Sequence, residues 1–339
     1  MGIYDYCITP LVSILVPIYN VERYIERCAR SVFEQTYENL EFIFVDDATP
    51  DDSVKILERV AEDYPQWKGR IKILYHDHNR GLAAARNTLV DNCKGVFITH
   101  VDSDDWVEPN MVELLMKRQQ ETDADIVTER MMAHLDDGTE KEAILGYNLE
   151  DEELFMAYMR HSVRWMMIGK LIRTSLYMEN GVRAVEGINM NEDFLAFAQL
   201  LYYAKRTTGV DRFLYHYDRT NVKSVVMNFE STWDFQWQSI KAHQHVVDFF
   251  KDKEPWMCNA ANKLLENCYA YTLLLTFENH NRKGYERVLA LMDGIPEENW
   301  SSIGWHRPAK RWLDHHYYLS RMVLPLRKLH GRVYQKFRA

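Results

Sequence analysis

The sequence predicts an α/β fold, in which a Rossmann-like, mostly parallel sheet is flanked by helices and followed by an α-helical C-terminal extension. Two observations lead to this expectation. Short β-branched apolar runs alternate four times with apolar residues at helical spacing within about 100 residues. Beyond about Asn228 the pattern is helical only. No G-x-G-x-x-G follows the first apolar run, which argues against a dinucleotide-binding dehydrogenase.

Four buried strands are expected in the N-terminal part, at residues 12–18, 40–45, 71–75 and 96–101. Helices are expected between them, at about residues 21–32, 54–60 and 82–90. Polar clusters follow the strand ends, at Tyr19, residues 46–47, 81–86 and 102–105. Because ligands of a parallel sheet bind beyond the carboxyl ends of its strands, these clusters are expected to share one site.

The rest of the chain is predicted to become progressively helical. We expect a helix at residues 111–117, a strand at 125–128 and a hairpin turn or loop at 136–138. A helix at 194–205 and a strand at 214–217 are expected next. Helices at 233–251, 256–279 and 284–292 should follow. We therefore expect three parts: an α/β domain over residues 1–227, a helical subdomain over 228–304 and a basic amphipathic helical tail over 305–339.

The composition is that of a soluble globular protein, with 47% hydrophobic and 27% charged residues among 339. No apolar run approaches the roughly 18–20 residues of a membrane span, and no signal peptide is recognisable, so a cytoplasmic protein is expected. The five cysteines are odd in number and lack C-x-x-C spacing. They are expected to be reduced thiols, since this pattern indicates neither a disulfide framework nor a zinc site.

The charge is distributed unevenly along the chain. From Arg307 to the C-terminus there are nine Lys or Arg residues and one acid, Asp314, so that the tail has a charge of +8. The net charge of the whole chain is −9. The preceding 306 residues therefore carry −17, which argues against nucleic-acid binding. The basic, amphipathic tail fits an anionic membrane surface on the inner face of the cytoplasmic membrane. Packing on its own domain or on another copy in a homo-oligomer is an equal alternative.

An acidic cluster, Asp102, Asp104 and Asp105, follows the fourth apolar run. An unpaired buried carboxylate costs several kcal/mol or more, so such a cluster requires a cation or solvent. The D-x-D at residues 102–104 is typical of a divalent metal held against a nucleotide diphosphate. A solvated acidic loop with a helix cap is the alternative.

Five motifs in register over about 200 residues resemble family 2 glycosyltransferases with the GT-A fold. They are VPIYN at 16–20, VDDATPDDS at 45–53, NRGLAAARN at 79–87, VDSDDW at 101–106 and NED at 191–193. The chain departs from the family at two positions where glycine is usual, Ala48 and Asn191. Asparagine also adopts positive φ, and neither change removes a functional group.

The resemblance implies a nucleotide-sugar donor, a UDP-sugar, and assigns residues to it. Asp47 matches the acid that hydrogen-bonds the base, where a carboxylate suits the imide N–H of uracil. Pro17 and Tyr19 would line the base pocket, Tyr19 by packing on a ring face. Arg80 and Arg86 would lie near the phosphates and ribose. Structural salt bridges are the alternative for both, and a functional role is favoured for Arg86.

The resemblance also implies a metal and a base. Asp104 matches the direct ligand of Mn²⁺ or Mg²⁺, and Asp102 the acid near the ribose and metal. His216 could complete the metal shell, although an ordinary strand histidine is the favoured interpretation. Asp193 matches the general base that takes the proton of the acceptor hydroxyl, and Glu192 would support it. A single base opposite the leaving group implies inversion of configuration.

The sequence thus favours a metal-dependent, inverting enzyme that transfers one sugar to a glycan or lipid-linked acceptor in bacterial surface polysaccharide synthesis. The Q-x-x-R-W of processive synthases is absent, because residues 161–165 read HSVRW and precede the base. A catalytically inactive sugar-nucleotide-binding scaffold is the alternative. A nucleotidyltransferase is disfavoured because no Gly-rich phosphate loop follows the first strand.

Overall fold

In residues 9–221 and 232–292, which the computed structural model describes, nine strands form one mixed sheet. Four parallel strands make its first half, in the order β3-β2-β1-β4. They are β1 (Val12–Ile18), β2 (Leu40–Asp46), β3 (Ile71–Tyr75) and β4 (Phe97–His100). Every residue of β1 is buried, as expected for a central strand covered on both faces.

The second half of the sheet mixes directions. It contains β8 (Leu171–Arg173) beside β4, then β6 (Ile126–His134), β9 (Thr207–Asp218) and β5 (Trp106–Val107), with β7 (Glu140–Ala143) paired to β6. β8 is antiparallel to β4 and to β6, whereas β6 and β9 are parallel. The predicted strands at 125–128 and 214–217 are both longer in the structure, because β6 continues to His134, β9 begins at Thr207 and the two strands pair along their length.

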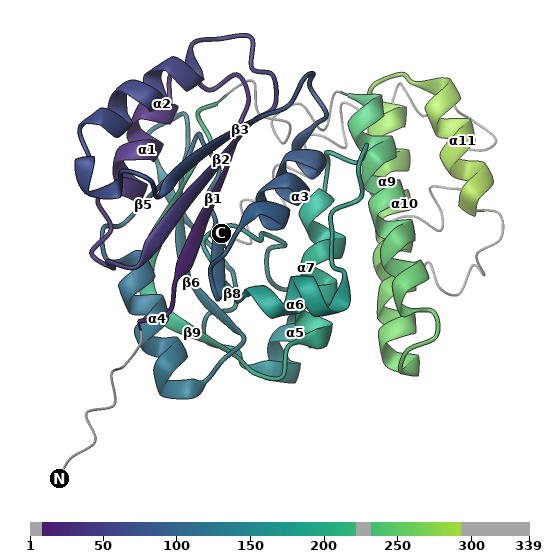
Figure 1. Ribbon diagram of the computed structural model, residues 1–339. Coiled ribbons are helices and arrows are strands. Elements are labelled where there is room, and N and C mark those ends of the chain that lie inside the picture. The colour runs from purple at the N-terminus through teal and green to yellow at the C-terminus, as the bar shows by residue number, and fades with distance from the viewer. Residues whose placement is uncertain (1–8, 222–231, 293–339) are drawn as a thin grey trace.

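Helices cover both faces of the sheet (Figure 1). The residues of one face pack against α1 (Ile25–Phe33), α2 (Ser53–Glu62) and α4 (Met111–Thr122), and the short 3-10 helix η1 (Pro65–Trp67) lies at the same core. The residues of the other face pack against α3 (Leu82–Asn92), α5 (Asp151–Met159), α6 (Thr174–Asn180) and α7 (Glu192–Tyr203). Neighbouring residues of β1 serve the two faces alternately, Ile14 and Val16 on one and Leu15 on the other.

A helical extension follows the sheet. It comprises α9 (Trp233–Phe250), α10 (Pro255–Glu278) and α11 (Arg282–Met292), and α9 packs on α7 (Figure 1). The predicted α/β class with a helical C-terminal extension is therefore confirmed. The expected boundary at residues 227–228 and the expected tail at 305–339 lie outside the described residues. Among the helices that are described, none is both long enough and apolar enough to cross a membrane.

Candidate active site

A pocket of about 940 Å³ opens beyond the carboxyl ends of β1, β2 and β4. Of the residues predicted for the site, its lining includes Pro17, Tyr19, Asp47, Arg86, Asp102, Asp104, Glu192 and Asp193. Members of all four polar clusters at the strand ends therefore line one pocket, as expected, and Glu192 and Asp193 of the later helix line it as well. His216 is absent from the lining.

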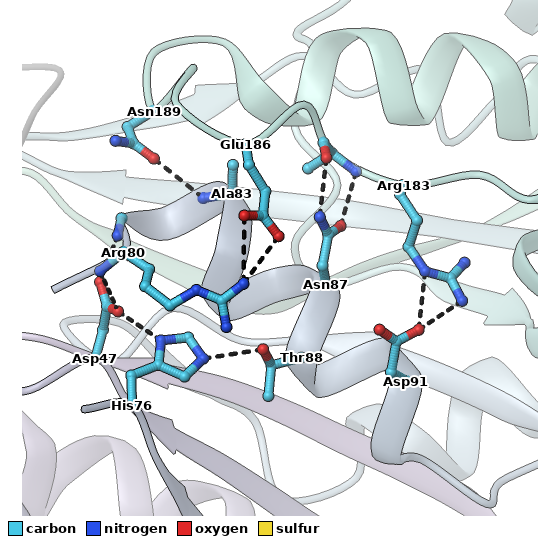
Figure 2. Close-up of polar contacts among 12 residues, drawn as sticks. Asp47, His76, Arg80, Ala83, Asn87, Thr88, Asp91, Arg183, Glu186 and Asn189 are labelled. Carbon is cyan, nitrogen blue, oxygen red and sulfur yellow. Dashed lines mark hydrogen bonds and ion pairs between the residues drawn. The ribbon is translucent and has the colours of Figure 1, made fainter. Parts of the chain in front are cut away.

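Asp47 lines the pocket and is held there by hydrogen bonds (Figure 2). Its Oδ1 is hydrogen-bonded to His76 Nδ1 at 2.6 Å and accepts the Arg80 N–H at 2.8 Å. Its Oδ2 accepts the Gly81 N–H at 2.7 Å. Gly81 has φ +89°, which suits glycine at the turn that begins α3. Asp47 thus fixes the turn beside the pocket as well as lining it.

The side chain of Arg80 turns away from Asp47 and pairs with Glu186 at 3.1 Å (Figure 2). Arg80 therefore forms a structural salt bridge, which was the alternative to a role at the phosphates and ribose. Tyr19, directly after β1, is 47% exposed, so that part of its side chain is open to solvent in the pocket. Ala48, where the family usually has glycine, has φ 54° and keeps the left-handed turn.

The three acids of the cluster after β4 have different surroundings. Asp105 is fully buried, accepting the Tyr215 hydroxyl at 2.7 Å and the Asp218 N–H at 2.8 Å. Asp105 thus fastens β9 to the loop that follows β4. Asp102 and Asp104 line the pocket, and Asn221 Nδ2 donates to Asp104 Oδ2 at 2.9 Å.

Arg86 connects the acidic cluster to the predicted base. The guanidinium is buried, and it donates from Nη2 to Asp102 Oδ1 at 2.9 Å and from Nε to Glu192 Oε1 at 3.0 Å. Its Nη1 has no hydrogen-bond partner among the described residues. Arg86 therefore has a structural ion pair and an unused donor in the same site.

Asp193 lies in the first turn of α7, beside Glu192. The left-handed φ of 61° at Asn191, expected from its replacement of glycine, starts this helix. Asp193 Oδ2 accepts one long hydrogen bond of 3.4 Å from the Met167 N–H. Burial, together with the charge of Glu192, raises the pKa of Asp193 to about 8. A carboxylate with this pKa is a far stronger base than an ordinary aspartate.

His216 does not join the acidic cluster, so the geometry gives no support to the expectation that it could be a metal ligand. Its Nδ1 is hydrogen-bonded to His134 Nε2 at 2.9 Å and its Nε2 to Glu108 Oε1 at 2.8 Å. Its ring stacks on Trp106, with centroids 4.9 Å apart. Both nitrogens are thus engaged, as the ordinary strand histidine of the alternative would be.

The wall formed by Asp102 and Asp104 suits a divalent cation. Burial and the charge of Asp102 raise the pKa of Asp104 to about 6, so an added positive charge would relieve the repulsion between the two. Their oxygens are the hard ligands that Mn²⁺ and Mg²⁺ prefer. Within the described ranges no group of three His, Cys, Asp or Glu side chains could hold a metal.

Sequence reasoning missed residues that position this site. Arg27 on α1 donates to the Asp104 carbonyl at 2.7 Å, pairs with Asp218 at 2.6 Å and lies 3.9 Å from the centre of the Trp106 ring. No local pattern could reveal this residue, because its two hydrogen-bonding partners lie 77 and 191 positions away in the sequence.

The segment that leads to Asp193 is also held from a distance. The Asn189 N–H donates to Gln238 Oε1 at 2.7 Å, and Asn191 Nδ2 donates to Ser239 Oγ at 2.8 Å. Asn189 Oδ1 accepts the Ala83 N–H at 3.2 Å (Figure 2). The helical extension therefore takes part in placing the base against α3.

Comparison with known proteins agrees with the fold. The family model for glycosyl transferase family 2 matches residues 13–178. The chain is 31% identical to the putative glycosyltransferase EpsH of Bacillus subtilis, over 66% of this chain and 64% of EpsH. It is 30% identical to the glycosyltransferase GlyG of Streptococcus pneumoniae, over 66% of this chain and 75% of GlyG. The match thus spans just under two thirds of EpsH and three quarters of GlyG.

Solved structures share the architecture. S. aureus TarS in complex with UDP-GlcNAc superposes with a TM-score of 0.65 at 18% identity, covering 85% of this chain and 82% of TarS. The mannosyltransferase PcManGT from Pyrobaculum calidifontis, in complex with GDP-Man and Mn²⁺, gives 0.52 at 17% identity, covering 94% and 87%. At these identities the likeness shows the fold, and the family rests on the sequence matches. The chain belongs to glycosyl transferase family 2.

Proposed function

We propose that this chain is a metal-dependent, inverting glycosyltransferase that moves one sugar from a UDP-sugar to a hydroxyl group of an acceptor. The acceptor would be a glycan or lipid-linked intermediate of a bacterial surface polysaccharide. The observation that carries the proposal is the pair of ion pairs Asp102–Arg86 and Arg86–Glu192, which joins the acidic wall of the pocket to the segment that bears Asp193. The complexes of TarS with UDP-GlcNAc and of PcManGT with GDP-Man and Mn²⁺ support a nucleotide-sugar donor and a metal.

The donor would bind between Tyr19 and the acidic wall. Tyr19 offers an exposed ring for the base, and Asp47 offers carboxylate oxygens beside it. The diphosphate would then lie near Arg86, whose Nη1 has no hydrogen-bond partner in the described structure. Asp102 and Asp104 would hold Mn²⁺ or Mg²⁺, which supplies Lewis-acid stabilisation to the departing diphosphate.

Asp193 would accept the proton of the acceptor hydroxyl as that oxygen attacks the anomeric carbon. Its raised pKa suits this role, because a general base works best when its pKa is near the working pH. Glu192 is committed to Arg86 at 3.0 Å, so it positions the guanidinium and raises the pKa of Asp193 by its charge. Attack from the side opposite to the leaving group would invert the anomeric configuration.

The acceptor would occupy the part of the pocket that lies away from Tyr19. The pocket lining includes Ile144, Trp165 and Phe235, which would form this part. The Trp165 ring stacks on Phe194 of α7, with centroids 4.2 Å apart. A flat apolar wall beside a carboxylate base suits the face of a sugar ring, whose hydroxyl then points at the base.

A screen of nucleotide sugars tests this proposal. UDP-sugars and GDP-mannose are each incubated with the full chain and Mn²⁺ or EDTA, and thermal shift and released nucleotide are measured. We expect one or more UDP-sugars to stabilise the protein and to be hydrolysed slowly with Mn²⁺, and EDTA to abolish both effects. Binding without any turnover would instead support the inactive scaffold, and no binding of any nucleotide sugar would refute the proposal.

For the tail, we propose peripheral binding to anionic lipid, where a lipid-linked acceptor would lie. The support is its charge of +8 between residues 307 and 339. Co-sedimentation with anionic liposomes compares the full chain with a variant that ends at Gly304. If both stay in the supernatant, the tail serves packing or assembly of a homo-oligomer instead.

A further inference from the structure

Two buried charges lie close to the pocket and have no part in the mechanism above. Glu129 is 0% exposed and Lys170 is 1% exposed. Removing either charge from water costs several kcal/mol unless the surroundings compensate. Apolar residues would fill the same volume without that cost. The presence of both charges therefore calls for a role.

The backbone around Glu129 is arranged to bring its carboxylate inward. The register between β6 and β9 shifts on either side of Arg130, which is the mark of a bulge. Gly169 has φ +81°, and a Cβ atom there would lie 2.5 Å from Glu129 Oε1. Neither oxygen of Glu129 has a hydrogen-bond partner in the part of the chain that is described. The carboxylate is thus seated against the backbone next to Lys170.

Lys170 lies on the far side of the segment that contacts the base. Its Nζ donates a long hydrogen bond of 3.5 Å to the Ile168 carbonyl. The same Nζ is 5.4 Å from the centre of the Phe197 ring, one turn beyond Asp193 on α7. Met167, the residue before Ile168, donates its N–H to Asp193 Oδ2. Lys170 and Asp193 therefore hold successive residues of one pocket-lining segment.

We propose that Lys170 is a positioning residue for Asp193: its ammonium, kept in the core by Glu129, fixes the Met167–Ile168 segment and stabilises the aspartate anion. Burial lowers the pKa of Lys170, whereas the charges of Glu129 and Asp193 favour its protonated form. Burial raises the pKa of Glu129 to about 7, and Lys170 opposes that rise. The inference rests on the proposed function in taking Asp193 as the base.

Other groups also face Asp193, from several elements. They are Glu192 on α7, Arg86 on α3, Asp102 after β4, Tyr158 on α5 and Tyr177 on α6. Arg86 divides its charge between Asp102 and Glu192. Arg86 is thus already paired with two acids, and the positive charge of Lys170 acts on Asp193 in addition to that of Arg86.

The test compares the unfolding midpoints of variants at pH values between 4 and 10, without nucleotide sugar or metal. The native pKa of Asp193 is raised above its unfolded value, so its ionisation destabilises the fold as pH rises. Asp193→Asn should therefore raise the unfolding midpoint increasingly from pH 4 until the native pKa is passed. This gain is measured in the wild type and in the Lys170→Met/Glu129→Gln background.

If Lys170 stabilises the anion, its loss raises the pKa of Asp193. The pH at which the gain levels off should then move up by about one unit or more. A matched background, Arg173→Met/Asp125→Asn, removes an ion pair of 2.7 Å that does not contact Asp193, and should leave the curve unchanged. Should the first background not fold, Lys170→Met alone replaces it, because Glu129 can then take up a proton.

Identical curves in the wild-type and Lys170 backgrounds would overturn the proposal. Because no nucleotide sugar is present, this outcome is independent of whether the chain transfers sugar. Failure of the nucleotide-sugar screen would remove the catalytic meaning of Asp193, whereas failure of the unfolding cycle would remove only the role of Lys170.

Discussion

Asp47 and Asp193 lie in the same pocket, and their surroundings are opposite. Asp47 is hydrogen-bonded to His76 and accepts the backbone N–H groups of Arg80 and Gly81, all within 2.8 Å. Asp193 has a single hydrogen bond to the described residues, of 3.4 Å, and Glu192 is its neighbour. Donors around a carboxylate stabilise the anion, whereas burial beside another acid destabilises it. The first arrangement suits binding and the second suits proton abstraction.

The contrast teaches how one sheet edge can provide two kinds of acid. At Asp47 a turn between β3 and α3 folds back and directs its N–H groups at the side chain. At Asp193, in the first turn of α7, burial raises the pKa most, and the charge of Glu192 adds to this rise. Substitutions at these two positions should therefore have different effects on binding and on turnover.

The largest effect is expected for Asp193→Asn. It should lower kcat by about 10³-fold, because a general base contributes on the order of 10²–10⁴. UDP binding in the presence of Mn²⁺ should stay within about twofold of the wild type, since Asp193 lies at the acceptor side. Transfer assays and calorimetric titration measure the two quantities. Full turnover by this near-isosteric variant would refute the assignment.

Asp47→Ala should have its main effect on binding. It leaves two N–H groups and His76 without their acceptor, at about 1–3 kcal/mol for each unsatisfied group. We expect UDP affinity to fall by about 100-fold and the unfolding temperature to fall with it. Asp47→Asn keeps one oxygen and should lose less of both. Unchanged UDP affinity in Asp47→Ala would mean that Asp47 is a structural residue only.

Asp104→Ala should weaken UDP binding by about tenfold or more with Mn²⁺, because it removes a hard oxygen ligand. Without metal, the same substitution should change UDP affinity little. Titrations in Mn²⁺ and in EDTA compare the two conditions. An equal loss in both would show that Asp104 contacts the nucleotide or supports the fold without binding the metal.

The smallest effect is expected for His216→Ala. Metal-dependent UDP binding should stay within about twofold, because both ring nitrogens are engaged away from the pocket. Stability should fall by about 1 kcal/mol with the loss of the Trp106 stack and the Glu108 hydrogen bond. Chemical denaturation measures this. A loss of metal dependence would restore His216 as a ligand.

Much of the first half of the sheet could be predicted from sequence, because its information is local. The run 12–18 is apolar except at Ser13, and all seven residues are buried in the structure. The positive φ at Asn191 likewise followed from the residue type. Such features depend on neighbours in the chain.

The rest depends on pairing between distant segments. Tyr217 lines the pocket, so the preceding residue, His216, points to the other face of β9. That register is set by β6 and its bulge, which no local pattern reveals. Asp105 differs in role from Asp104 because Tyr215, 110 positions later, reaches it. The sequence shows equivalent acids, and only the tertiary structure separates them.

The pH dependence of turnover tests most directly whether Asp193 serves proton abstraction and Asp47 serves binding. The rate is measured at saturating donor and Mn²⁺ in the wild type, Asp193→Asn and Asp47→Asn. We expect the wild-type rate to fall at low pH, with a midpoint well above the ordinary pKa range of an aspartate. Asp47→Asn should retain this acidic limb, whereas the residual rate of Asp193→Asn should lack it. A limb that survives in Asp193→Asn, or one that lies near pH 4 in the wild type, would contradict the assignment of Asp193 as the base.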